Sequence, residues 1–206
     1  MGLHVSTHPL TAHLLTVLRD VTTPPSAFRS AARTLSTILS LEATADLESE
    51  AVSVQTPLEV TKGSRLENGL AAVPILRAGL SMLEPLLELF PDVAVGYIGL
   101  ERDHETAEAS RYYCKLPKLD GKVAVCLDPM LATGGSAAKA IELIKEGGPK
   151  RVVMVSVVAA PEGVEKLQAV HPDVPIYTAG LDRQLNPNKY ILPGLGDYGD
   201  RLYGTQ

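Results

Sequence analysis

The chain has 206 residues, 45% of them hydrophobic, and a formal net charge of −5 at pH 7. A chain of this size and composition can bury one sizeable hydrophobic core, so we expect a single domain over residues 1–206. The acidic balance argues against a nucleic-acid-binding surface, which needs clustered lysines and arginines to neutralise phosphates.

The cysteines and the N-terminal segment bear on the cellular location. Cys114 and Cys126 belong to no CxxC pair and to no cluster with metal-ligand spacing. We therefore expect no disulfide framework, as is typical of proteins in a reducing cytoplasm. The chain starts without the basic and apolar regions of a signal peptide, and it has no apolar run long enough to span a membrane. These features predict a cytoplasmic protein that does not cross a membrane.

The chain is predicted to begin with two helices. Apolar residues recur at helical spacing in residues 9–20 and again in residues 27–46. The sequence TTPPS at 22–26 breaks the pattern between them. We expect the N-terminal helices to occupy residues 9–46.

Short apolar runs and helical patterns alternate through the rest of the chain. The runs predict strands at 71–76, 93–100, 122–128, 152–160 and 174–180. The helical patterns lie at 80–89, 136–145 and 162–169. Near-continuous apolar strands joined by helices indicate a parallel sheet with helices on both faces. Ligands of such sheets bind where the carboxyl ends of strands meet the N-termini of helices.

One segment interrupts this alternation. Residues 101–118 are polar and too numerous for a tight turn, which predicts a hairpin or flap projecting from the sheet edge. With Tyr112 and Tyr113, the segment suits an arm that clasps a partner subunit. It suits a solvated lid over the active site equally well.

The first candidate binding segment is VCLDPMLATGGS at residues 125–136. The predicted strand places Asp128 at the sheet edge, and the following TGGS sequence opens a helix. Gly134 and Gly135 let backbone N–H groups converge on an anion, and the hydroxyls of Thr133 and Ser136 add donors. This order favours a phosphate site over the simpler alternative, an ordinary turn with a serine N-cap. No lysine follows the glycines, so the segment is not a Walker A loop.

Two further segments reach the same predicted edge. The sequence VPILRAGL at 73–80 places Arg77 there, which suits phosphate oxygens, although an arginine after a strand is more often a surface ion-pair partner. The tail at 190–205 contains four glycines and two aspartates, which predicts a structured loop with an accessible backbone. A planar heterocycle could be recognised by such a backbone. The apolar residues of the tail predict that it packs against the body.

Taken together, these segments resemble the uracil phosphoribosyltransferase family of the type I phosphoribosyltransferases. The sequence LDPMLATGGS resembles their phosphoribosyl-diphosphate loop, in the Asp-Pro form typical of this family. Other segments match in the expected order over nearly the whole chain: HPLTAHLLTVLRD, VPILRAGL, IGLERDHETAEASRYYCKLP, AAPEGVEKLQAVHPDV and YILPGLGDYGDR. The resemblance implies an α/β fold with a parallel sheet, flanking helices, a projecting flap or arm at 101–118, and a base-binding hood at 180–206.

The resemblance also implies an activity and its participants. Such an enzyme converts uracil and 5-phospho-α-D-ribose 1-diphosphate (phosphoribosyl diphosphate) to UMP and diphosphate, in pyrimidine salvage. Mg²⁺ accompanies the sugar diphosphate, without a metal site built by the protein alone. A homodimer or higher homo-oligomer is implied, and no nucleic acid or membrane partner. Regulation of an allosteric enzyme by GTP is left open by the sequence.

Carried over to this chain, the resemblance implies roles for individual residues. Asp128, Arg77 and Arg102 are implied to be catalytic, because a carboxylate favours positive charge on the ribose and arginines favour negative charge on the leaving diphosphate. Uracil is implied to bind at Ile191, Gly196, Asp197 and Tyr198. Phosphoribosyl diphosphate is implied to bind at Arg77, Arg102, Asp128, Pro129, Met130, Leu131, Ala132, Thr133, Gly134, Gly135, Ser136 and Asp197.

Two residues depart from the family's usual pattern. Glu101 stands where a tyrosine is common, which adds a negative charge beside Arg102. Tyr198 stands where alanine is usual, so either the base pocket is narrower or the phenol turns outward.

Two other functions suit the same motifs. One is a regulatory protein of this fold that senses phosphoribosyl diphosphate while contacting RNA or DNA. It should show a basic face or an added DNA-binding domain, and neither is visible in the sequence. The other is an enzyme for a different nucleobase, since the phosphate-binding loops are shared.

Overall fold

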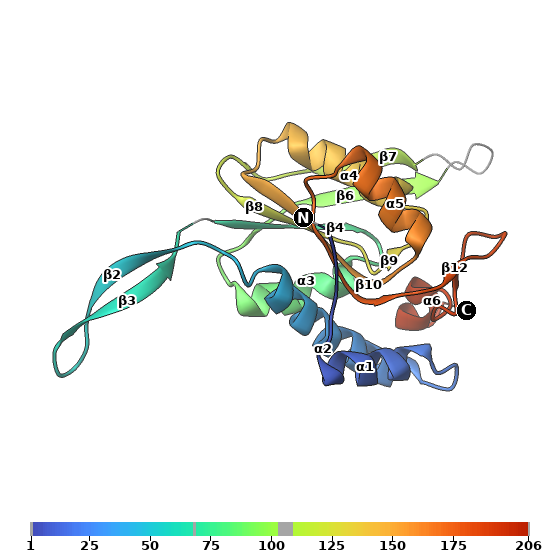
Figure 1. Cartoon of the computed structure of the whole chain (residues 1–206), viewed down its shortest axis with the longest axis horizontal. Helices are drawn as coiled ribbons and strands as arrows, with labels where there is room; N and C mark the ends of the chain where they lie inside the picture. Colours follow the sequence, from blue (N-terminus) through green and yellow to red (C-terminus); the bar gives the residue numbers. More distant parts are fainter. Residues whose placement is uncertain (1, 68, 103–108, 206) are drawn as a thin grey trace.

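The computed structural model of the chain describes residues 2–67, 69–102 and 109–205. Its centre is a nine-stranded sheet with the strand order β1-β11-β10-β8-β4-β6-β7, in which β5 pairs with β4 and β9 with β10 (Figure 1). The described pairings are parallel except for β6 with β7. The strands are β1 (Leu3–Val5), β4 (Leu70–Leu76), β5 (Ala94–Val95), β6 (Tyr97–Arg102), β7 (Ala109–Lys115), β8 (Val123–Leu127), β9 (Met130–Leu131), β10 (Arg151–Ala159) and β11 (Ile176–Leu181).

Helices cover both faces of the sheet because successive strand residues point to opposite sides. In β8, Val123 and Val125 pack into one apolar cluster, whereas Ala124 and Cys126 pack into the other. The prediction of a largely parallel sheet between helices is therefore confirmed. The first cluster is covered by α1 (Pro9–Arg19), α2 (Pro25–Ala43), α3 (Leu80–Leu89) and α6 (Tyr198–Tyr203), and the second by α4 (Gly135–Glu146) and α5 (Pro161–Val170) (Figure 1).

A hairpin that the sequence pattern does not predict projects far from the body. It consists of β2 (Ser49–Gln55) and β3 (Val60–Leu66), which pair with each other and form a sheet of their own (Figure 1). Neither strand has a buried residue, and Leu58 near the tip is 93% exposed. A strand with no buried face lacks the alternation by which strands are predicted.

The segment expected to form a flap lies at the β7 edge of the main sheet. Strands β6 and β7 pair there as an antiparallel hairpin with a register shift at Gly99 and Leu100. Residues 103–108 between them lie outside the described part of the chain. The choice between an arm and a lid at 101–118 stays a prediction, and the projecting arm that Figure 1 shows is the β2–β3 hairpin.

Both cysteines are free thiols. Cys126 is fully buried in β8, and this burial raises the pKa of its thiol well above the usual range. The thiolate is the nucleophilic form, so Cys126 is chemically inert and acts as a small core residue. Among the helices of the described chain, none has the length and apolar character needed to cross a membrane.

Candidate active site

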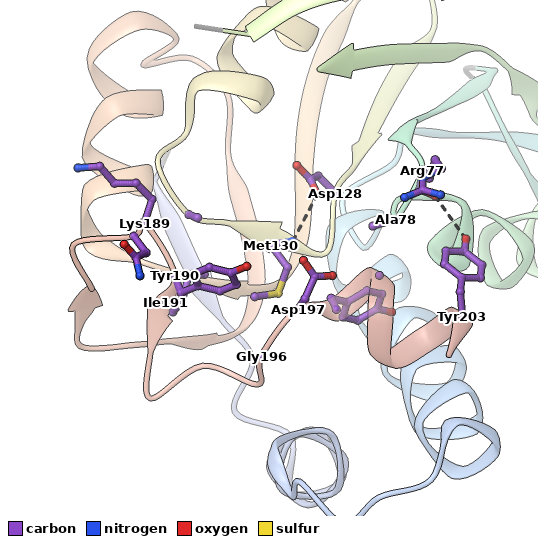
Figure 2. A pocket seen from close by; sticks show the side chains of 14 residues that line it. Arg77, Ala78, Asp128, Met130, Lys189, Tyr190, Ile191, Gly196, Asp197 and Tyr203 are labelled. Atoms are coloured by element: carbon purple, nitrogen blue, oxygen red, sulfur yellow. Dashed lines mark hydrogen bonds between the residues drawn. The ribbon is translucent and has the colours of Figure 1, made fainter. Parts of the chain in front are cut away.

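A cavity of about 450 Å³ opens where β4 and β8 end, at the edge that the sequence predicts for ligand binding (Figure 2). Three segments line it: the turn after β4, the connection after β8, and the C-terminal tail. The lining residues are Arg77, Ala78, Asp128, Met130, Ala132, Asn188, Lys189, Tyr190, Ile191, Gly196, Asp197, Tyr198, Gly199 and Tyr203.

The turn after β4 brings Arg77 to the cavity. A cis peptide bond joins Leu76 to Arg77. Gly79 closes the turn so tightly against β8 that a Cβ at this position would lie 2.4 Å from the carbonyl oxygen of Leu127. Only glycine fits there without moving the backbone. Arg77 is exposed at the rim, and its carbonyl oxygen accepts a 3.4 Å hydrogen bond from the hydroxyl of Tyr203.

The connection after β8 is held firmly against β10. The amide groups of Val157 and Val158 both donate to the carbonyl of Pro129 at 3.0 Å, and the amide of Leu131 donates to Ser156 Oγ at 3.1 Å. Pro129 and Leu131 are buried, so of this connection only Asp128, Met130 and Ala132 line the cavity. Asp128 is half-buried, and its Oδ1 accepts from the amide of Met130 at 3.4 Å (Figure 2).

The glycines of the TGGS sequence make the turn into α4. Gly134 has a φ of 76°, and a Cβ there would lie 2.7 Å from the carbonyl oxygen of Gly163 at the start of α5. Gly134 is the N-cap of α4 and no side chain caps this helix, so the alternative of a serine N-cap at Ser136 is wrong. A helix N-terminus of this kind is suited to binding an anion. Residues 133–136 follow directly after the cavity lining.

The C-terminal tail packs against the body, as its apolar residues predict. It forms β12 (Gln184–Leu185) and β13 (Ile191–Leu192) and ends in α6. The expectation of a loop with little regular structure is wrong for α6, because Asp197 begins that helix by accepting the amide of Asp200 at 2.9 Å. The side chains that anchor the tail in the core are Ile191, Leu195, Tyr198 and Leu202.

A buried ion pair fixes the tail to α1. Arg19 donates to both carboxylate oxygens of Asp182, at 2.9 and 2.6 Å. The same two side chains hold Gly194, whose amide donates to Asp182 at 2.8 Å and whose carbonyl accepts from Arg19 at 2.7 Å. The sequence pattern does not reveal this arrangement, although a charged residue at the end of an apolar strand was a signal for it.

Arg201 fixes the same loop from the other side. Its guanidinium donates to the carbonyl oxygens of Leu195 at 2.8 Å and Asp20 at 2.6 Å, and also to that of Leu18. It lies 4.6 Å from the centre of the Phe28 ring, within the range of a cation–π contact. The loop at 194–197 is therefore held to the end of α1 by two arginines.

We expect Asp182→Ala to lower the free energy of unfolding by about 3 kcal/mol, because it leaves Arg19 and the amide of Gly194 without their acceptor. The side chain of Asp182 is only 5% exposed, and that of Arg19 is 27% exposed. Urea denaturation measures the loss. The matched control is Glu88→Ala, which breaks the exposed Arg33–Glu88 pair and should cost less than about 1 kcal/mol. An equal loss in both variants would contradict an anchoring role for Asp182.

The held loop presents backbone groups to the cavity. The amide groups of Gly196, Asp197 and Tyr198 have no hydrogen-bond acceptor among the described residues. Gly194 has a φ of 62°, and a Cβ there would lie 2.2 Å from the carbonyl oxygen of Ile191. Donors and a nearby carbonyl acceptor suit a flat ligand that carries both carbonyl and N–H groups.

Tyr198 turns into the protein rather than toward solvent. Its side chain is 2% exposed, and its ring meets the Phe28 ring edge-on at a centroid distance of 5.3 Å. Its hydroxyl lies 3.0 Å from Ser81 Oγ, and burial raises its pKa to about 12. The outward orientation considered from the sequence is therefore wrong. Tyr198 borders the cavity from the core side.

The family is decided by comparison with known proteins. The family model described as uracil phosphoribosyltransferase matches residues 5–205.

The chain belongs to the uracil phosphoribosyltransferase family. It is thereby a pentosyltransferase, one class of glycosyltransferase. Relatives named uracil phosphoribosyltransferase include those of Thermosipho melanesiensis, 47% identical over the whole of both chains, and Listeria innocua, 48% identical over 100% of this chain and 99% of the relative. The relative from Dictyoglomus thermophilum is 50% identical over 97% of each chain.

Solved structures agree with the fold. The AQ2163 protein from Aquifex aeolicus is 39% identical and superposes with a TM-score of 0.94 over 99% of each chain. The hypoxanthine phosphoribosyltransferase from Trypanosoma cruzi is 11% identical, with a TM-score of 0.52 over 76% of this chain and 75% of the other. The second similarity shows the fold alone, which is that of the type I phosphoribosyltransferases.

The cavity gathers most of the side chains to which the family resemblance assigns roles. Eight of them line it together: Arg77, Asp128, Met130, Ala132, Ile191, Gly196, Asp197 and Tyr198. The side chain of Arg102 lies outside the described part of the structure, so its assignment to diphosphate stays a prediction. The lining residues to which sequence reasoning gave no role lie within or next to the motifs it found: Ala78, Asn188, Lys189, Tyr190, Gly199 and Tyr203.

The charges of the cavity are mixed. Arg77 and Lys189 contribute cations, and Asp128 and Asp197 contribute carboxylates that lie between them in Figure 2. Within residues 2–67, 69–102 and 109–205, no three His, Cys, Asp or Glu side chains gather as they would around a metal ion. Such a lining suits a ligand that combines anionic groups with a sugar or a base.

Proposed function

We propose that the protein transfers the 5-phosphoribosyl group of phosphoribosyl diphosphate to uracil, yielding UMP and diphosphate in pyrimidine salvage. The observation that carries this proposal is the convergence of the Arg77 turn, the Asp128 connection and the tail loop on one cavity. Its volume of about 450 Å³ is typical of small-molecule sites. Membership of the uracil phosphoribosyltransferase family supports the choice of reaction.

The reaction places charge where the cavity has complementary groups. As the bond from the anomeric carbon to the diphosphate oxygen breaks, positive charge develops on the ribose and negative charge on the diphosphate. Asp128 is proposed to face the ribose and Arg77 the diphosphate, with Arg102 as a second cation by family resemblance. Fixed charges of the right sign lower the barrier because they need no reorganisation during the reaction.

The 5′-phosphate is proposed to lie at the start of α4. Residues 133–136 offer backbone amides at a helix N-terminus, together with the hydroxyls of Thr133 and Ser136. The buried Pro129 and Leu131 contribute to this site through the backbone, which their burial holds in place.

Mg²⁺ is proposed to enter with the sugar diphosphate. It prefers oxygen ligands and retains several waters, so one carboxylate and a diphosphate are a suitable donor set. Asp197 is the cavity carboxylate proposed for this role, since Asp128 is proposed to face the ribose. The ion would neutralise charge on the leaving diphosphate.

We expect Arg77→Ala to weaken phosphoribosyl diphosphate binding at least tenfold, since a charge-assisted hydrogen bond contributes about 1.5 to 3 kcal/mol. Uracil affinity should change little. Isothermal titration with each ligand measures both effects. The matched control is Arg33→Ala on the exposed face of α2, which should bind both ligands like the parent. Unchanged affinity in Arg77→Ala would make Arg77 a surface arginine only.

The β2–β3 hairpin supports a proposal about assembly. A two-stranded hairpin alone is marginally stable in water, and this one exposes Val54, Leu58, Val60 and Leu66. We propose a homodimer in which the hairpin packs on the second copy. Light scattering should give a dimer mass for the full chain, and a monomer mass when residues 50–65 are replaced by a short Gly-Ser link. A monomeric full chain would refute the proposal.

Product detection tests the function directly. The protein is mixed with Mg²⁺, phosphoribosyl diphosphate and uracil, and UMP is separated by chromatography. UMP should appear only when all components are present. Binding of phosphoribosyl diphosphate without UMP formation would favour the alternative of a regulatory protein that senses this ligand.

A further inference from the structure

A chain of hydrogen bonds runs beneath the cavity floor. The hydroxyl of Tyr198 lies 3.0 Å from Ser81 Oγ, and Ser81 Oγ donates to the carbonyl oxygen of Ala78 at 2.9 Å. A serine hydroxyl has a single hydrogen, which Ser81 gives to Ala78. Tyr198 must therefore be the donor to Ser81. The hydrogen bonds are therefore donated from Tyr198 to Ser81 and from Ser81 to the carbonyl of Ala78.

The two ends of this chain belong to different parts of the cavity. Ala78 follows Arg77 in the turn after β4, and Tyr198 follows Asp197 in the tail loop. A second bond joins the same two segments, because the hydroxyl of Tyr203 donates to the carbonyl of Arg77 at 3.4 Å (Figure 2). Both tyrosines lie on α6. The short terminal helix thus connects the segment proposed to bind uracil with the segment proposed to bind diphosphate.

The connection is stiff at the Tyr198 end. The ring is buried against Phe28 and has no room to change rotamer without displacing core side chains. Burial raises the pKa of the phenol to about 12, so it stays a donor at every pH at which an enzyme of this kind would work. A displacement of either segment is transmitted to the other through groups that are already ordered.

We propose that Tyr198 is a positioning residue that couples the two substrate subsites, so that occupancy of the Arg77 turn raises the affinity of the tail loop for uracil. This inference rests on the proposed function, since it takes uracil and the diphosphate moiety as the two ligands.

The coupling is measured by isothermal titration of uracil, first with Mg²⁺ alone and then with Mg²⁺ and saturating inorganic diphosphate. Uracil and inorganic diphosphate do not react with each other, so the two titrations differ only in the uracil affinity. Diphosphate should tighten uracil binding by the parent protein. Tyr198→Phe removes one hydroxyl and retains the ring. The coupling factor should therefore decrease by about two- to tenfold, which is the contribution of one neutral hydrogen bond. The reverse titration must give the same factor, because coupling between binding sites is reciprocal.

Two variants distinguish coupling from a structural role. Ser81→Ala should reduce the coupling factor as Tyr198→Phe does, and the double variant should reduce it no further, because both changes break the same chain. Tyr177→Phe is the matched control: it removes a phenol that stacks on His4, outside the cavity lining, and should keep the parent's coupling. Loss of thermal stability without loss of coupling would assign Tyr198 a structural role only.

The outcomes separate this inference from the proposed function. Uracil binding that diphosphate does not affect in the parent protein, or equal coupling in the parent and Tyr198→Phe, overturns the inference while UMP formation continues. Absence of both uracil binding and UMP formation overturns the proposed function and the inference with it.

Discussion

Uracil should be used on the order of 10⁴-fold better than cytosine, because the backbone of the tail loop is proposed to recognise the base. The amides of Gly196, Asp197 and Tyr198 are proposed to donate to a uracil carbonyl, and the carbonyl of Ile191 to accept from a ring N–H, since these four residues line the cavity. Cytosine presents an amine where the loop presents a donor. Two buried donors then face each other, and each loses its hydrogen bond to water without compensation.

The ratio of kcat/KM for the two bases at saturating phosphoribosyl diphosphate measures this selectivity. The control is the dissociation constant of phosphoribosyl diphosphate measured without a base, which shows that its binding site is intact in the same preparation. Purines should also be used hardly at all. Comparable kcat/KM values for cytosine and uracil would refute recognition by the backbone and, with it, the assignment of uracil as the substrate.

Asp128→Asn should lower kcat by roughly 10² or more while phosphoribosyl diphosphate binding changes only a few-fold. The carboxylate is proposed to favour the positive charge that develops on the ribose, and this charge is absent from the bound substrate. Asparagine keeps an oxygen for the amide of Met130, so the connection after β8 should retain its conformation. The variant removes the negative charge and replaces one carboxylate oxygen by an amide nitrogen.

Single-turnover rates and the dissociation constant of phosphoribosyl diphosphate separate the two effects. Asp173→Asn is a suitable control, because that carboxylate forms an exposed pair with Lys145 outside the cavity lining. Its kcat should equal that of the parent. Full turnover by Asp128→Asn with weakened binding would show that Asp128 contacts the substrate before the reaction and does not act on the transition state.

The sheet and its helices were predictable because their pattern is local. Strands such as β8 and β10 are buried on both faces, so they appear in the sequence as continuous apolar runs. The helices on either side show apolar residues at helical spacing. The position of the cavity follows from the same pattern, because parallel strands bring Arg77 and Asp128 to one edge.

The projecting hairpin and the terminal helix were not predictable in this way. Strands β2 and β3 bury neither face, so their sequence has no period to detect. The helix α6 is only six residues long, which is too short for a helical spacing of apolar residues to be detected. Its stability comes from packing against α2 and from the Asp197 cap, which are tertiary and local contacts that composition does not reveal.

By itself, the sequence determined the central strands of the sheet, the longer helices around them, the edge at which the cavity opens, and the chemical types of Arg77, Asp128 and the tail loop. Only the tertiary structure decided how the loop is held and where Tyr198 points. Arg19 meets Asp182 across 163 residues of sequence, and Tyr198 meets Ser81 across 117. Such pairs form because the tertiary fold brings distant segments of the chain together, and no periodicity in the sequence reveals which segments will meet.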